Sequence, residues 1–206
     1  MKYISVPVGI LSVNCYIVYD GNGVGAVIDP GDNARAILST AQANGVRIDT
    51  MLLTHTHFDH VMAADEIRSH TGAKLLAPSA DECTLHRALP GLCPPGYRPP
   101  EIDGFFQDGD KIMVGDMVFS VMHTPGHTPG SCCIVAEDLI FSGDTLFEGT
   151  IGRTDFPGGN MSEMMRSLSE LSKMNDEYIV LPGHGGSTSI GRERLQNPYF
   201  KERSKK

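Results

Sequence analysis

Four side chains that bind metal ions well lie within six residues of one another, from His55 to His60. His55, His57 and Asp59 occupy alternate positions, so in an extended chain they point to the same side, and His60 follows directly. Imidazole and carboxylate groups are together the usual ligands of Zn²⁺ and similar ions. A chance polar loop would not be expected to hold so many of them. The segment therefore predicts a metal site rather than part of a packed core.

Three further metal-binding side chains follow apolar segments later in the chain, each in a turn close to glycine. They are His127, Asp144 and His184. Turns at strand ends are where a rigid scaffold can direct side chains into one cleft, and glycine lets the backbone approach a site closely. The complete set supplies enough ligands for two metal ions. A bound metal ion lowers the pKa of water toward about 7, so the residues predict a hydrolytic centre that needs no serine or cysteine nucleophile.

The elements that must position these side chains alternate between strands and helices. In the first half we expect strands at 3–8, 14–19, 24–28, 51–53 and 74–77, with helices at 34–44 and 60–70. In the second half we expect strands at 111–114, 117–123, 132–136, 139–142 and 178–181, with helices at 161–174 and 190–196. A short helix is expected from Ser79 to about His86, and the proline-rich segment 88–104 is interpreted as a surface loop or lid. The alternation predicts two facing sheets with helices on both outer faces.

Composition and charge limit the classes of function. The chain has 206 residues, 40% of them hydrophobic, and a formal net charge of −8, which is typical of a single acidic globular domain spanning residues 1–206. Basic residues form a run only in the short tail Lys201–Lys206, so neither a nucleic acid nor an anionic membrane is an expected partner. No apolar run approaches the ~20 residues that span a bilayer, and residues 1–7 lack the apolar core of a signal peptide.

The five cysteines favour a reducing compartment. Their number is odd and no CxxC pair occurs among them. We therefore expect reduced thiols that mostly serve packing, and a cytoplasmic protein. A reactive Cys93 within the proline-rich segment is the alternative interpretation.

The spacing of the ligands resembles that of the metallo-β-lactamase superfamily over essentially the whole chain. This resemblance implies an α+β fold, the four-layer αββα sandwich of that family. It also implies one metal site made by His55, His57 and His127, a second made by Asp59, His60 and His184, and Asp144 bridging the two. Asp59 is further expected to orient the attacking water. Two divalent ions per chain are implied, with zinc expected first and iron or manganese as alternatives.

Two segments narrow the resemblance to the glyoxalase II-like branch, in particular its short bacterial members. They are Gly143–Phe147 and Gly152–Phe156. Glyoxalase II hydrolyses the thioester S-lactoylglutathione, so the resemblance implies a small-molecule thioesterase that uses a hydroxide bridging two metal ions. Arg153 lies where that family has a basic residue in contact with glutathione and is the candidate for substrate binding, with a structural salt bridge as the alternative. The C-terminal helical domain of the longer enzymes has no counterpart here, and Gly186 replaces a tyrosine of that family, so a different thiol fits equally well.

Two other functions stay open at this stage. The same segments resemble the related persulfide dioxygenases, which bind one iron ion through only the positions of His55, His127 and Asp144 yet retain much of the longer motif. A binding module without catalysis is the third hypothesis, although binding alone does not require an open centre for two ions. No pattern in the sequence indicates an oligomeric state.

Overall fold

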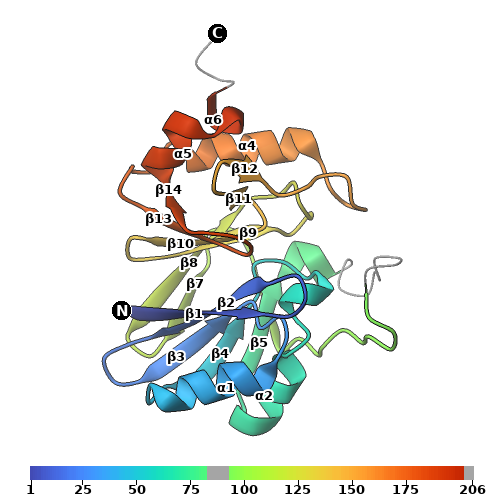
Figure 1. The fold of residues 1–206 in the computed structure, drawn as a ribbon, viewed down its shortest axis with the longest axis vertical. Helices are drawn as coiled ribbons and strands as arrows, with labels where there is room; N and C mark the ends of the chain where they lie inside the picture. Colours follow the sequence, from blue (N-terminus) through green and yellow to red (C-terminus); the bar gives the residue numbers. More distant parts are fainter. Residues whose placement is uncertain (83–92, 202–206) are drawn as a thin grey trace.

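The computed structural model describes residues 1–82 and 93–201, which contain two facing six-stranded sheets (Figure 1). The first sheet has the order β1 (Lys2–Val8), β2 (Val13–Tyr19), β3 (Val24–Ile28), β4 (Arg47–Leu52), β5 (Lys74–Pro78) and β6 (Gly104–Phe106). Its first three strands are antiparallel neighbours, and β3 to β6 are parallel. The second sheet has the order β14 (Thr188–Ser189), β13 (Ile179–Pro182), β10 (Leu139–Gly143), β9 (Cys132–Ala136), β8 (Met117–His123) and β7 (Lys111–Val114).

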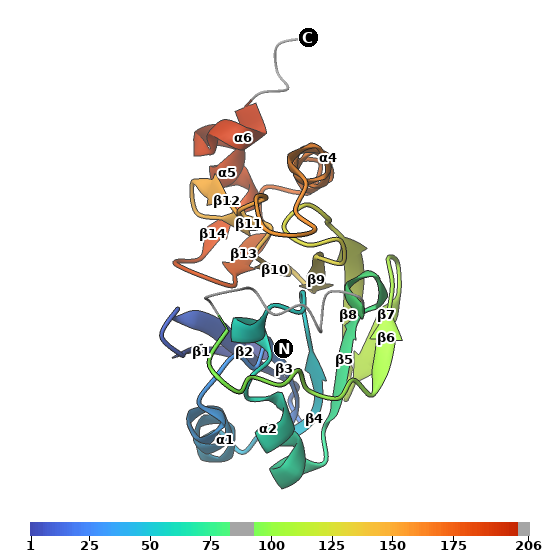
Figure 2. The ribbon, with the colours of Figure 1, turned by 90° about the vertical axis from the view of Figure 1, so that its right-hand side faces the viewer.

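Three apolar clusters join the layers. The cluster between the two sheets includes Phe119 and Phe141, both fully buried. A second cluster, containing Ile37 and Ile67, lies under α1 (Ala34–Ala43) and α2 (Ala64–Thr71). The third, which contains Leu168, lies under α4 (Met161–Leu171), α5 (Ile190–Gln196) and α6 (Pro198–Lys201). Figure 2 shows these helices on opposite outer sides of the paired sheets, so the four-layer α+β sandwich expected from the sequence is confirmed.

Strand β4 shows how the sequence places the first ligand segment. Met51 and Leu53 pack in the cluster under α1 and α2, whereas Leu52 packs between the sheets, and all three side chains are fully buried. A continuous apolar run is what a strand covered on both faces requires. The strand ends at Leu52, so His55 emerges at its carboxyl end, where β3 and β5 end alongside it.

The helix expected at 60–70 was wrong in its first part. Residues Phe58–His60 form one 3₁₀ turn, in which the His60 N–H bonds to the carbonyl of His57, and α2 begins only at Ala64. This 3₁₀ turn is tighter than an α-helix, and it separates the extended chain before it from the α-helix that follows. The strand expected at 51–53 is also longer, because it begins at Arg47.

The short elements were not expected from the sequence. They are β6, β14, α6 and a separate hairpin of β11 (Leu146–Phe147) and β12 (Thr150–Ile151). Segments of two to four residues are too short for a hydrophobic period to be detected. The helix expected from Ser79 begins as a 3₁₀ turn, Ser79–Asp81, and its remainder lies outside the described residues, as does the first part of segment 88–104.

Two further expectations concern the whole chain. None of the helices in the described ranges is both long and apolar enough to cross a bilayer. Within the described residues, no disulfide joins Cys15, Cys93, Cys132 or Cys133 to another cysteine.

Candidate metal centre

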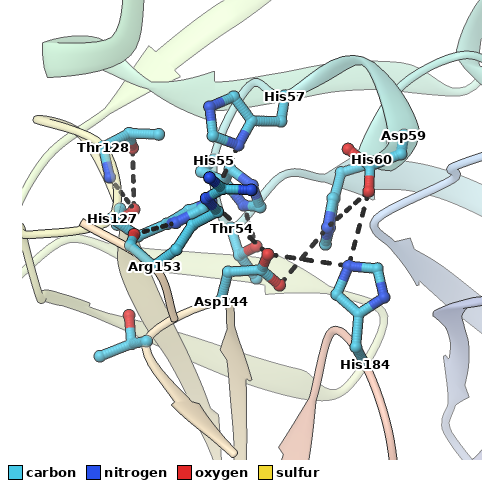
Figure 3. A network of polar contacts seen from close by, with 12 residues as sticks. Thr54, His55, His57, Asp59, His60, His127, Thr128, Asp144, Arg153 and His184 are labelled. Atoms are coloured by element: carbon cyan, nitrogen blue, oxygen red, sulfur yellow. Dashed lines mark hydrogen bonds and ion pairs between the residues drawn. The ribbon is translucent and has the colours of Figure 1, made fainter. Parts of the chain in front are cut away.

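The seven predicted ligands come from both sheets and meet at one edge of the sandwich. His55 and His57 follow β4 of the first sheet, whereas Asp144 follows β10 and His184 follows β13 of the second. His127 lies in the loop between β8 and β9. Figure 3 shows the side chains of all seven converging on one small volume. The structure therefore brings together every residue that the sequence pattern selected.

The first group contains the three histidines expected to share one ion. One ring nitrogen from each of His55, His57 and His127 lies within 4.8 Å of the others. The closest pair is His127 Nε2 and His57 Nδ1, which are 2.8 Å apart. The three rings lie nearly perpendicular to one another, with centroids 4.6–4.9 Å apart. Three imidazole nitrogens facing a common point form the ligand set of a zinc-type site.

The second group contains Asp59, His60 and His184, whose ligand atoms also lie within 4.8 Å of one another. Asp59 Oδ2 is 3.5 Å from His184 Nε2 and 3.8 Å from His60 Nε2. Asp144 lies between this group and the first. Its Oδ1 is 3.5 Å from His60 Nε2, and its Oδ2 is 3.5 Å from His127 Nε2. One carboxylate thus faces both groups, which is the position expected for a bridging ligand.

Three atoms of these groups test whether metal ions fit. His55 Nε2, His60 Nε2 and Asp144 Oδ1 are buried polar atoms with no hydrogen-bond partner among residues 1–82 and 93–201. An unsatisfied buried polar group costs about 1–3 kcal/mol, so several of them at one place require an explanation. All three atoms point into the space between the ligand groups, and nitrogen with carboxylate oxygen is a donor set that divalent cations bind. The residues therefore fit divalent metal ions.

The outer nitrogen of most of these histidines is held by a fixed partner. His55 Nδ1 lies 3.1 Å from Thr54 Oγ1, and His127 Nδ1 lies 2.8 Å from the Arg153 carbonyl. His184 Nδ1 lies 3.1 Å from the Leu11 carbonyl. These contacts orient each ring so that Nε2 faces the centre, the arrangement that tunes metal-binding histidines generally. His57 differs, because its Nδ1 is the atom that faces the other ligands.

Asp29 is a functional residue that sequence reasoning missed. Its Oδ2 lies 2.9 Å from His60 Nδ1 and accepts a 2.7 Å hydrogen bond from Thr54 Oγ1, while its Oδ1 accepts from the Thr54 N–H. A carboxylate oxygen of Asp29 also lies close to ring nitrogens of His55 and His60. Both oxygens of Asp29, however, already bond to Thr54 or His60. We therefore interpret Asp29 as the group that holds His60. The signal was its position directly after a buried strand, the same position that marked Asp144.

Asp81 was also missed, and it joins the two loops that carry the first group. Its side chain is completely buried. It accepts hydrogen bonds from the Thr56 N–H at 3.1 Å, from Thr128 Oγ1 at 2.8 Å and from the Gly130 N–H at 2.6 Å. Thr56 lies between two predicted ligands of one loop, and Thr128 follows His127 in the other. This carboxylate thereby fixes the distance between the loops.

The charges of the cluster differ between the two groups. Burial, and after it the neighbouring His127, lowers the pKa of His57 to about 3. Burial also lowers the pKa of His55. Burial alone would lower the pKa of His60, but Asp29, Asp144 and Asp59 together outweigh it and raise that pKa to about 10. In the metal-free chain the first group is therefore poised to bind a cation at neutral pH, whereas His60 holds a proton.

A cleft of about 480 Å³ opens over the centre. Its walls combine predicted ligands with the apolar side chains of Leu11, Phe58, Phe147, Ile151 and Phe156. Arg153 lies at this cleft, with its guanidinium carbon 3.6 Å from the centre of the Phe156 ring. Its Nε and Nη2 donate to the two oxygens of Asp155 at 2.7 and 2.8 Å. Both interpretations of Arg153 thus have a basis, since it forms a salt bridge and also faces the cleft.

Comparison with known protein families identifies the architecture. The model of the metallo-beta-lactamase superfamily matches residues 8–184, a range that ends at the last predicted ligand. The chain belongs to this superfamily. It is 33% identical over 208 residues to hydroxyacylglutathione hydrolase GloC of Haemophilus influenzae, an alignment that covers 97% of this chain and 98% of that protein. The resemblance found in the sequence is therefore confirmed at the level of the family.

Solved structures of the superfamily agree with the fold. The BLEG-1 B3 metallo-beta-lactamase superposes with a TM-score of 0.88 at 30% identity, covering 97% of this chain and 100% of that one. ETHE1 from Myxococcus xanthus superposes with a TM-score of 0.80 at 29% identity, covering 96% of this chain and 84% of that one. The fold is common to relatives that carry different names, so the substrate has to be argued from the site.

Proposed function

We propose that the chain is a hydrolase with two divalent metal ions that cleaves a small thioester of the hydroxyacylglutathione type. The observation that carries the proposal is the place of Asp144, whose two oxygens face His60 and His127 in separate ligand groups at 3.5 Å each. Two complete ligand groups with a carboxylate between them provide for two ions, although a one-iron persulfide dioxygenase retains much of the same motif. The relation to GloC of Haemophilus influenzae supports the thioester as substrate class. Zinc is the proposed metal, with iron or manganese as alternatives.

The residues of the site would have separate roles in binding the metal ions and in orienting water. Two bound divalent ions would supply a water of lowered pKa and would polarise the substrate carbonyl. His55, His57 and His127 would hold one ion, Asp59, His60 and His184 the other, and Asp144 would contact both. Asp59 lines the cleft with a side chain that is still 14% exposed, so its carboxylate is placed to orient the attacking water.

The cleft would hold the rest of the substrate. Phe147, Ile151 and Phe156 offer apolar surface for the acyl and thiol parts, and Arg153 offers a cation for a carboxylate of the thiol. Glutathione is one such thiol, and another small acidic thiol would make the same contacts. Among the described cysteines, Cys15, Cys132 and Cys133 are buried and form no disulfide, which supports a cytoplasmic protein; this stays a prediction.

The decisive experiment combines metal content with three activity assays. We expect about two divalent ions per chain and hydrolysis of S-lactoylglutathione under nitrogen, with His57→Ala folded but inactive. A β-lactam should be assayed beside it, because the similar BLEG-1 protein is a metallo-β-lactamase. The second candidate, an iron persulfide dioxygenase, predicts one iron ion per chain and oxygen uptake with a thiol persulfide. That result, without thioester cleavage, would overturn the proposal.

A further inference from the structure

Glu193 of α5 is a carboxylate outside the candidate metal centre, yet its exposed fraction is only 1%. Its Oε2 accepts hydrogen bonds from the Gly149 N–H and from Asn197 Nδ2, each at 2.8 Å. Its Oε1 accepts from Thr188 Oγ1 at 2.6 Å. Burying a carboxylate is expensive unless donors surround it, so this position is built to hold the three donors in place.

The first of these donors belongs to the wall of the cleft. Gly149 lies in the turn between β11 and β12, and this hairpin supplies Phe147, Thr150 and Ile151 to the lining. The hairpin also connects Asp144, the predicted bridging ligand, with Arg153. It has only two residues in each strand, and among the described residues these strands pair only with each other. A hairpin of this size is not stable by itself, so the conformation of the wall depends on what holds it from outside.

Helix α5 and the residue after it hold the hairpin at three points. Glu193 binds the Gly149 N–H, Asn197 Nδ2 donates to the Thr150 carbonyl at 3.1 Å, and Arg192 Nη2 lies 2.6 Å from Glu148 Oε1. Asn197 is completely buried, whereas the Arg192 pair is exposed to solvent. An exposed ion pair contributes little, so the two buried contacts determine the position of the turn.

The other oxygen of Glu193 reaches the loop after β13. Thr188 lies in β14, four residues after His184, and pairs there with Val180 of β13. The His184 ring in turn lies 6.2 Å from the Phe147 ring of the hairpin. One buried carboxylate therefore connects the segment that follows a predicted ligand with the neighbouring hairpin that lines the cleft.

We propose that Glu193 is a positioning residue for substrate binding, which sets the place of the 146–151 hairpin relative to the metal centre. The inference rests on the proposed function only in that thioester kinetics are used to detect it. Glu193 contacts neither a predicted ligand nor the cleft itself. Its loss should therefore weaken substrate binding without removing the metal ions, a combination that general destabilisation would not produce.

The test compares Glu193→Ala and Glu193→Gln in the full, metal-loaded chain. For Glu193→Ala we expect the KM for S-lactoylglutathione to rise about tenfold, because a displaced wall contacts the substrate in the wrong place, with kcat changed less and metal content unchanged. Glu193→Gln should stay within about threefold of the original KM, since its amide oxygen can still accept from Gly149 and its amide nitrogen can donate to the Thr188 hydroxyl. Hydrogen exchange of residues 146–151 should accelerate in Glu193→Ala and not in Glu193→Gln.

Asp20→Ala is the matched control. Asp20 is also a buried carboxylate, and it accepts from the backbone N–H groups of Asn22, Val24 and Asp116 in turns remote from the cleft. We expect it to lower stability and leave KM unchanged. If Glu193→Ala does not fold, Glu193→Asp retains the charge but cannot span the same distance, and it should show the same KM effect more weakly.

Two results would overturn the inference. The first is an unchanged KM in Glu193→Ala, or in Glu193→Asp if that is the variant which folds. The second is faster exchange spread evenly over the chain instead of concentrated at 146–151. If the original protein cleaves no thioester, the proposed function fails by itself, and the exchange comparison still decides whether Glu193 holds the hairpin.

Discussion

The Nδ1 atom of His60 lies 2.9 Å from Oδ2 of Asp29, and both side chains are almost completely shielded from solvent. The contact directs His60 Nε2 toward Asp59 and Asp144, where this atom has no hydrogen-bond partner in the part of the chain that the structure describes. The pair therefore links the end of β3 to the second ligand group. It makes the chemistry of that group depend on a residue that binds no ion in the proposed scheme.

Asp29→Asn is expected to weaken the second metal site selectively. Asn tolerates the left-handed backbone of this position, where φ is 51°, so the variant should fold. It loses the negative charge that raises the basicity of His60, and losses of about 10–100-fold in metal affinity or activity are typical of such partners. Metal analysis after dialysis should show about one ion per chain, with Asp20→Asn as a control that keeps both. Two tightly held ions in Asp29→Asn would contradict the interpretation.

The two ligand groups should load metal with different pH dependence. His55 and His57 have lowered pKa values, that of His57 being about 3, so these rings have no proton to lose between pH 6 and 8. The pKa of His60 is raised to about 10, so in this range a cation must displace its proton. The pKa of His184 in the same group is also raised, so affinity at the second group should rise with pH by at least about tenfold per unit, while affinity at the first changes less.

The raised pKa of His60 also determines how the stability of the folded metal-free chain changes with pH. Because the pKa of His60 is higher in the folded metal-free chain than the ~6.5 of an unfolded one, the contribution of His60 to folding stability is fully present below about pH 6.5 and is lost as the pH rises toward 10.

Zinc titrations against a competing chelator at pH 6, 7 and 8 measure the affinities of the two ligand groups directly. Equal slopes for both groups would show that His60 does not hold its proton as inferred.

Much of the site could be predicted because metal ligands obey short-range rules. The spacing from His55 to His60 marks a site by residue type alone, and later ligands follow recognisable strands. The role of Asp29 could not be predicted, because Asp29-Pro30-Gly31 has the composition of a turn. Only the parallel pairing of β3 with β4 shows which groups the carboxylate contacts. The role of Glu193 could not be predicted for a related reason. A glutamate in a short helix is expected to be exposed to solvent, and the burial of this one depends on a hairpin 44 positions away in the chain.

Arg153→Ala should raise KM for a thioester whose thiol carries a carboxylate. Asp155 and the Phe156 ring hold the guanidinium at the cleft, so the cation is preorganised and its loss should cost about tenfold or more. An uncharged thioester, such as that of N-acetylcysteamine, should be cleaved as before. Arg166→Ala, which removes an exposed arginine paired with Glu163 on α4, is the control. An equal loss for both substrates would instead favour a purely structural salt bridge.

Gly183→Ala is expected to disrupt the metal centre, because Gly183 lies directly against two of the predicted ligands. A Cβ atom at Gly183 would lie 2.5 Å from Asp144 Oδ1 and 2.7 Å from His60 Cε1, so one of these two predicted ligands would have to move. Both are held by the surrounding structure, so the displacement should reduce metal content and lower kcat/KM by about 10–100-fold. The same substitution at Gly186, three residues later, offers a matched comparison.

At Gly186 a Cβ would meet only Oε2 of Glu148, the end of a flexible side chain, at 3.1 Å. Gly186→Ala should therefore retain both ions and nearly full activity. Metal analysis, thermal unfolding and thioester kinetics on the pair separate a local effect at the ligands from a general effect of substitution in this loop. Should both variants lose activity alike, or Gly183→Ala keep both ions, the close approach of the backbone to Asp144 and His60 would not be a requirement of the site.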